Sequence, residues 1–377
     1  MNHWIVIVFA AFGISMMLTG IIIPQILLIA FRKKLFDELD ERKIHRGAVP
    51  RLGGIAFYPS LLCTASLVIG VALRWGDNVS DLMPQPDTYV PMIFAVCSMT
   101  LLYLVGIADD IVGVRYRAKF VIQIICAILT VGSGVYVADL CGLFGLDQIP
   151  EWAAWILSGF MVVYIINAVN LIDGIDGLAS GLCAVALIFY GTVFFFADRY
   201  ACSLVAWCMA GALLSFFYYN VFGKVINQNK IFMGDTGSLT TGMVIAFLFL
   251  EMGRIPEQTY VAIPFNPIVL AFSPLVIPLL DVIRVAVRRM QKGKNPFLPD
   301  RTHIHHKLLA LGMSGGWALG VIIVTDLFFI AFNLLCSIYI NINIVFLADV
   351  VIWLAANRWL TTRIRRREAR LGQKLYD

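Results

Sequence analysis

Charged residues are scarce in this chain of 377 residues. Asp, Glu, Lys and Arg together make up 14% of it, and apolar residues make up 60%, whereas soluble proteins carry about 25% charged residues. A soluble fold of this length could not bury so much apolar surface, because a single core stops growing at about 250–300 residues. Disorder is excluded too, since disordered segments have low hydrophobicity. The composition, with a mean hydropathy of +0.84, predicts an integral membrane protein.

The sequence also lacks the patterns of other membrane and secreted classes. Transmembrane barrels alternate polar and apolar residues, but the apolar runs here are long and unbroken. The first run, residues 4–31, is too long for the core of a signal peptide and has no basic start. None of the eight cysteines forms a CxxC pair. We interpret them as packing residues and expect no disulfide framework.

The apolar runs predict an all-α, polytopic protein with eleven transmembrane helices. About 20 residues cross a bilayer as a helix. We expect one transmembrane domain over residues 1–377 that ends in a basic tail, 358–377, and we interpret residues 74–89 as a solvated outer loop. The predicted spans are 4–31, 52–73, 90–107, 120–138, 152–169, 178–197, 201–222, 237–250, 261–283, 316–338 and 342–357. The ninth carries four prolines and is expected to be broken.

The basic residues predict an orientation. With the N-terminus outside and the C-terminus cytoplasmic, 26 of the 29 Lys and Arg residues lie on the cytoplasmic side, as the positive-inside rule requires. The net charge of +5 is therefore a topology signal and does not indicate nucleic-acid binding. The basic tail is expected to meet anionic lipid. Polar residues that could do chemistry gather on the same side, in five motifs.

The first motif, Gly-Ile-Ala-Asp-Asp-Ile-Val-Gly, places Asp109 and Asp110 where the third span ends. Like charges this close raise one pKa unless a cation shares them. A hard cation with oxygen ligands, above all Mg²⁺, would resolve the repulsion. A shared proton would too, leaving a general base, and a solvated pair at a span end is a third alternative. Lys119 follows and can hold phosphate.

The second motif, residues 170–181, begins at Asn170 and carries Asp173 and Asp176 on one face if it is helical. Its glycines, Gly177 among them, permit tight turns or close approach of a ligand. No basic residue lies within it, and uncompensated acids at a membrane boundary are costly and functional by default. We therefore expect a binding or catalytic role and not a plain loop.

The third motif, Lys-Ile-Phe-Met-Gly-Asp-Thr-Gly-Ser at residues 230–238, opens the eighth span. Backbone N–H groups at a helix start bind phosphate, and Asp235 adds a third carboxylate for a metal site. Phe232 either stacks on a base or sugar or anchors the span at the interface.

Two further motifs are basic. Arg301, His303, His305 and His306 lie within seven residues; no cysteine or carboxylate spacing supports zinc, so we favour phosphate donors. Residues 40–54, which include His45 and Arg51, are rich in basic residues and lead into the Gly-rich start of the second span. Membrane topology alone could explain these positive charges. Asp281 and Arg284 are either a structural ion pair or catalytic. Three carboxylate groups and several cations beside a lipid-facing groove predict phosphotransfer from a cytosolic donor to a membrane lipid.

These motifs resemble, in sequence and order, those of the polyprenyl-phosphate N-acetylhexosamine-1-phosphate transferase family. The resemblance covers residues 42–308 and implies a Mg²⁺-dependent enzyme, with Mn²⁺ as an alternative, in the bacterial cytoplasmic membrane with a cytoplasm-facing site. It implies transfer of a sugar 1-phosphate from a UDP-sugar to undecaprenyl phosphate, with release of UMP. The forms of residues 42–54 and of the histidine motif resemble the GlcNAc-1-phosphate branch, so we favour UDP-GlcNAc. A related UDP-N-acetylhexosamine and the phospho-MurNAc-pentapeptide branch are the alternatives.

The resemblance also implies roles. Asp109 and Asp110 resemble the pair that deprotonates or orients the lipid phosphate. Asp235, with Asp173, resembles the residues of the metal site. Substrate contacts are implied for a larger set: Asn170, Asp176, Gly177, Asn220, Phe232, Lys119, Arg301, His45 and Arg51. The histidines match the family's His-x-His-His motif. We expect direct attack of the lipid phosphate on the β-phosphorus, with a covalent aspartyl intermediate as the rival.

Other classes fit the sequence less well. A transporter predicts acids near the bilayer midplane and related halves, but the candidate acids lie on one side and no inverted repeat is visible. A CDP-alcohol phosphotransferase would place an Arg after its Asp-Gly and further aspartates on the same helix, which residues 176–180 do not. A catalytically inactive scaffold would not need intact acids. The sequence leaves the glycan pathway and the oligomeric state, a homodimer included, open.

Overall fold

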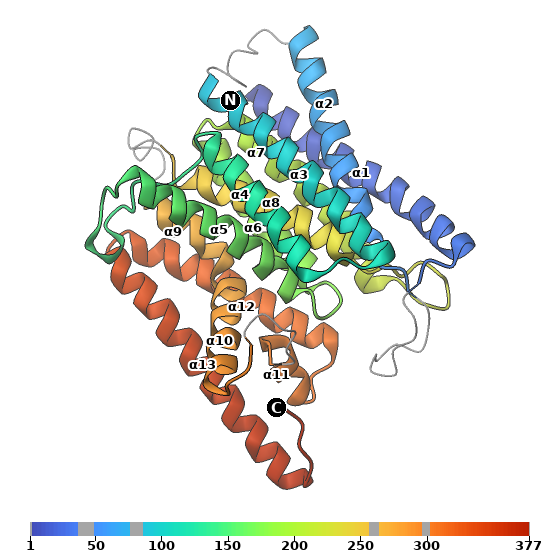
Figure 1. Cartoon of the computed structure of the whole chain (residues 1–377), viewed down its shortest axis with the longest axis vertical. Coiled ribbons are helices and arrows are strands. Elements are labelled where there is room, and N and C mark those ends of the chain that lie inside the picture. The colour runs from blue at the N-terminus through green and yellow to red at the C-terminus, as the bar shows by residue number, and fades with distance from the viewer. Residues whose placement is uncertain (1, 37–48, 76–85, 256–263, 296–301, 377) are drawn as a thin grey trace.

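A computed structural model describes residues 2–36, 49–75, 86–255, 264–295 and 302–376 (Figure 1). The described residues form helices and no β-strand, which confirms the predicted all-α class. His45, Arg301 and most of the predicted loop 74–89 lie outside the described residues. The helices are α1 (Asn2–Lys33), α2 (Phe57–Trp75), α3 (Pro86–Val112), α4 (Tyr116–Gly132), α5 (Glu151–Ile172), α6 (Leu178–Phe196), α7 (Tyr200–Phe217), α8 (Gly234–Met252), α9 (Pro267–Phe272), α10 (Val276–Gln291), α11 (Ile304–Ala310), α12 (Gly315–Ser337) and α13 (Ile342–Leu371).

Each predicted span coincides with a helix or a helix pair. Nine helical segments of the described chain are long and apolar enough to cross a membrane, so the chain is a multi-pass membrane protein. The other two predicted spans correspond to α4, which has 17 residues, and α8, which starts with polar residues. The count of eleven and the orientation therefore stay predictions. The ninth span is broken as its prolines predicted, into α9 and α10 with a 3₁₀ turn, Ser273–Leu275, between them.

Helix α8 is the centre of the fold. Every residue of Thr236–Met252 is buried, and α3, α5, α6 and α7 pack against it. Figure 1 shows α8 in yellow crossing the middle of the bundle. In α3, a Cβ at Gly106 would collide with the backbone at Thr236, so a glycine is what lets these two helices approach so closely. The third motif is thus built into the start of the most enclosed helix.

Helix α13 lies at the edge of the molecule, in red in Figure 1. It continues without a break from Ile342 to Leu371, so the predicted basic tail begins inside a helix. Its last described residues turn back, because Glu368 Oε1 accepts hydrogen bonds from the N–H groups of Leu375 and Tyr376. The tail therefore ends against the body of the protein.

Candidate active site

The end of α3 caps the start of α8. Asp110 accepts hydrogen bonds from the N–H groups of Asp235 and Thr236, at 2.7 and 3.0 Å, and from the Thr236 hydroxyl at 2.5 Å. These N–H groups have no partner within the helix, and a carboxylate there also complements the helix dipole. Both oxygens of Asp110 are thus engaged, and they fix where the Asp235 side chain begins.

Lys119, at the start of α4, lies between two carboxylates. Its Nζ is 2.6 Å from Asp235 Oδ2 and 3.1 Å from Asp109 Oδ2. Burial opposes the charge of Lys119, but the bonds to Asp235 and Asp109 outweigh it and raise its pKa. Ligand oxygens of Asp109, Asp110 and Asp235 all lie within 4.8 Å of one another. Such a group of oxygens fits a hard divalent cation.

Asp173 and Asp176 follow α5 at the same end of the molecule. Lys230 donates to Asp176 Oδ2 at 2.6 Å, so a lysine from the third motif supplies the pairing that the second motif lacks. Asp173 is exposed as a residue, but the surrounding protein desolvates its carboxyl group. This desolvation, and then the charges of Asp235 and Asp176, raise its pKa. Asp173 does not belong to the group of three carboxylates within 4.8 Å.

Asparagines join the second and third motifs. Asn220, in the π-helical turn Tyr218–Phe222, accepts the N–H of Gly177 at 2.6 Å and donates to the carbonyl of Ile231 at 2.8 Å. Asn170 donates to Ser238 Oγ at 2.8 Å. Gly177 has φ +81°, which a larger residue would adopt only with strain. Asn220 therefore lies at the site, with both ends of its amide group engaged by backbone.

The fifth motif pairs with the third like a short piece of sheet. The Phe232 N–H donates to Pro50 O, and the Gly53 N–H donates to Phe232 O, both at 2.9 Å. The carbonyl of Arg51 packs against Gly234, whose φ is +73° and where a Cβ would also meet Asp110. Residues 49–54 thus hold Phe232, which is half-buried, beside the carboxylate cluster.

The histidine motif closes another side of the site. His305 packs on Gly174 so closely that a Cβ there would overlap its ring. Burial lowers the pKa of His305 to about 3, and the nearby His306 and His303 act in the same direction. Its ring is 4.1 Å from that of the half-buried His306. Neither ring nitrogen of His305 has a hydrogen-bond partner in the described part of the chain.

A buried network holds the histidine motif in place. Asp281, on α10, is fully buried and bonds Arg284 at 2.7 Å and His303 Nδ1 at 2.9 Å. The carbonyl of Thr302 accepts from Arg284 Nη2 and from the hydroxyl of Tyr376, at 2.5 and 2.8 Å. Asp281 and Arg284 thus form an ion pair, as one of the two alternatives predicted, while a catalytic role stays a prediction, and the C-terminal segment braces the same loop.

The predicted site residues within the described chain come from all five motifs, and close contacts join those motifs to one another. Sequence reasoning missed two of the partners. Lys230 and Thr236 both belong to the third motif, but the sequence assigns a role to neither. Their place in the motif that contains Gly234 and Asp235 is a sequence signal for both residues. Only the fold shows which groups they bind.

The segment that holds these carboxylates matches the model of a known protein family. Residues 92–253, from α3 through α8, match the model of glycosyl transferase family 4. This stretch contains the first three motifs in full, and the histidine motif lies beyond it. The matched segment therefore contains the carboxylate cluster, while the histidine motif and residues 49–54 lie outside it.

Named relatives extend the match. Undecaprenyl-phosphate alpha-N-acetylglucosaminyl 1-phosphate transferase of Escherichia coli (strain K12) is 30% identical over 292 residues, which are 76% of this chain and 72% of that protein. A Bacillus subtilis (strain 168) protein, named probable undecaprenyl-phosphate N-acetylglucosaminyl 1-phosphate transferase, is 29% identical over 346 residues, or 92% and 86% of the two chains. The chain belongs to this family of membrane transferases, as its motifs predicted.

Proposed function

We propose that the protein transfers GlcNAc-1-phosphate from UDP-GlcNAc to undecaprenyl phosphate and releases UMP, at the cytoplasmic face of a bacterial inner membrane. The observation that carries the proposal is the cluster of Asp109, Asp110 and Asp235 at the start of α8, with basic side chains around it. The names of the relatives support the acceptor and the sugar. A related UDP-N-acetylhexosamine and the phospho-MurNAc-pentapeptide donor remain the alternatives to test.

The cluster fits Mg²⁺. Three carboxylates with ligand oxygens within 4.8 Å match the oxygen ligands that Mg²⁺ takes, and Mn²⁺ accepts the same set. Asp235 and Asp109 would hold the ion through the Oδ2 atoms that Lys119 now bonds, because the oxygens of Asp110 already bind the start of α8. Asp173 would act on the ion through the negative charge of its nearby carboxylate. When bound, a divalent cation neutralises charge on the pyrophosphate.

The chain's own residues account for the phosphoryl transfer. An oxygen of undecaprenyl phosphate forms a bond to the β-phosphorus, the bond between the β-phosphorus and the bridging oxygen breaks, and UMP leaves with the bridging oxygen on its phosphate. Asp109 would take the proton of a singly protonated lipid phosphate. Lys119, released from its carboxylates, would stabilise charge on the equatorial oxygens. The histidine motif and Arg51 would face the same phosphates from the other side.

The nucleoside end would lie near Phe232. The pairing with residues 49–54 fixes the backbone of Phe232, so its ring can serve as a stacking platform for uracil. Asp176 would accept from the uracil ring once Lys230 shifts. Asn220 positions this segment through Gly177 and Ile231 and is assigned no contact with the base.

The test is UMP release by detergent-purified protein with undecaprenyl phosphate and a panel of donors. The panel is UDP-GlcNAc, UDP-GalNAc and UDP-MurNAc-pentapeptide, each with and without Mg²⁺. Mg²⁺-dependent release of UMP with UDP-GlcNAc alone supports the proposal. Release with another donor moves the assignment to that donor. Folded protein that yields UMP with none of them contradicts the transferase proposal.

A further inference from the structure

The outward face of α13 changes from apolar to basic along the helix. Ile344, Leu347, Val351 and Leu354 are each more than half exposed, at 57, 61, 55 and 54%. They recur every three or four residues and therefore share one face of the helix. Large apolar side chains on the open face of a membrane helix are expected to meet acyl chains.

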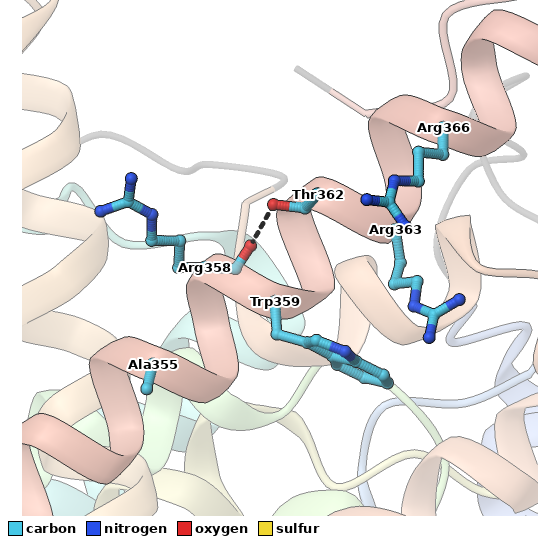
Figure 2. Close-up of a pocket in the computed structure, with 6 residues that line it drawn as sticks. All are labelled: Ala355, Arg358, Trp359, Thr362, Arg363 and Arg366. Carbon is cyan, nitrogen blue, oxygen red and sulfur yellow. Dashed lines mark hydrogen bonds between the residues drawn. The ribbon is translucent and has the colours of Figure 1, made fainter.

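The same face ends in a basic hollow. About 350 Å³ of space lies among side chains from the next turns of the helix. Figure 2 shows them: Ala355, Arg358, Trp359, Thr362, Arg363 and Arg366. Trp359 is 57% exposed, and the Arg363 guanidinium lies 5.2 Å from the centre of its ring. Tryptophan at the boundary between apolar and basic residues is typical of the level of lipid headgroups.

The arginines of the hollow have no anionic partner. No carboxylate in the described part of the chain pairs with Arg358, Arg363 or Arg366, whereas Arg284 pairs with Asp281 at 2.7 Å. Arg367, one residue beyond, donates to the carbonyl of Ala310 and so ties α13 to α11. The helix is thus anchored on its inner side while three positive charges face outward.

We propose that this hollow binds the headgroup phosphate of an anionic phospholipid from the cytoplasmic leaflet. The phosphate would sit among the guanidinium groups of Arg358, Arg363 and Arg366, which suit phosphate oxygens. Its acyl chains would lie along the stripe of exposed apolar residues on the same face. The continuity of that stripe with the hollow favours a lipid over a soluble anion or a nucleic acid, and the lipid is bound apart from the carboxylate cluster.

The test measures lipid binding to the full-length protein by native mass spectrometry. The detergent-solubilised protein is titrated with phosphatidylglycerol or with phosphatidylcholine of the same chains. Phosphatidylglycerol should bind preferentially, and the triple variant Arg358→Gln/Arg363→Gln/Arg366→Gln should bind it at least about tenfold more weakly. A triple-lysine variant at the same positions keeps the charge and should retain most of the binding. Inorganic phosphate should not compete at millimolar concentration.

A charge-matched control removes three cations elsewhere. Arg32→Gln/Lys33→Gln/Lys34→Gln changes exposed residues at the end of α1 and should leave phosphatidylglycerol binding within about twofold of wild type, since charge attraction falls off within a Debye length. Three results would each overturn the proposal: no preference for phosphatidylglycerol, equal loss in both triple variants, or displacement by inorganic phosphate. The readout needs no turnover, so it stands apart from the proposed transferase activity.

Discussion

The basic side chains at the start of α8 and those on α13 differ in their partners. Lys119 bonds Asp109 and Asp235, and Lys230 bonds Asp176, while the α13 hollow holds arginines that no described carboxylate pairs with. The paired lysines let several acids lie together where water is limited. They also keep cations beside the acids that a phosphate substrate can recruit. The arginines of the hollow have no partner carboxylate among the described residues, and on our proposal they bind an anion from outside the protein.

The largest effect should come from Lys119. Lys119→Met leaves Asp109 and Asp235 without their shared cation and removes a charge that stabilises the transition state. We expect kcat for UMP release to fall about 10²–10³-fold. Lys224→Met, a change at an exposed lysine of the same predicted side, should leave kcat within about twofold. Steady-state kinetics with UDP-GlcNAc would measure both, and equal rates in the two variants would remove Lys119 from the mechanism.

The next largest effect should come from disrupting the close approach of α3 and α8. Gly106→Ala places a Cβ against the Thr236 backbone, and we expect it to lower the unfolding free energy by about 1–3 kcal/mol. Gly70→Ala in α2 meets nothing within 4 Å and should be neutral or slightly stabilising. Thermal melting in detergent compares the two. A Gly106→Ala protein as stable as Gly70→Ala would show that the helices can separate at no cost.

The pairing of Lys230 with Asp176 should affect substrate binding more than chemistry. Lys230→Gln and Asp176→Asn should each raise KM for the UDP-sugar about tenfold, with a smaller change in kcat. Because the side chains are 2.6 Å apart, the double variant should cost less than the product of the two single effects. Strict additivity in the double-mutant cycle would mean that the two residues act separately.

Lys307 is a third kind of basic side chain, since it is buried and, among the described residues, bonds only neutral groups. Its Nζ donates to the carbonyl and the side-chain oxygen of Asn357. Burial, and after it the charge of Arg284, lowers the pKa of Lys307 to about 7. Between pH 7 and the ordinary lysine pKa near 10 the unfolded chain binds a proton that the folded chain does not.

Stability should therefore rise with pH over that window, by about 1 kcal/mol for each pH unit. Lys307→Met removes the titrating amine and should flatten this rise. Melting temperatures from pH 7 to pH 10 provide the measurement. Parallel curves for the variant and the wild type would show that Lys307 keeps its ordinary pKa.

The sequence predicted the helices well, for a physical reason. Apolar runs of span length and a one-sided distribution of Lys and Arg are local signals that need no knowledge of packing. Contacts between distant segments are not local. Lys230 and Asp176 are 54 positions apart, and nothing in either motif shows that they meet. The pairing of residues 49–54 with Phe232 runs through backbone groups, which every residue carries.

The role of Asp110 shows the same limit. Adjacent carboxylates predicted a shared cation or proton, and the structure does place Asp109 beside a lysine. Asp110 instead accepts the free N–H groups of α8. Which member of the doublet faces the cation depends on the direction of each side chain at the end of α3, and the sequence does not carry that information.

The most direct test of the account compares two carboxylates under single-turnover conditions. Asp235→Asn should reduce UMP release from UDP-GlcNAc about 10³-fold, and chelation of divalent ions should reduce the wild-type rate until Mg²⁺ is restored. Asp147→Asn, at an exposed loop aspartate away from the site, should release UMP at the wild-type rate. Wild-type turnover by the Asp235→Asn protein, or indifference to chelation, would contradict a reaction centred on the carboxylate cluster.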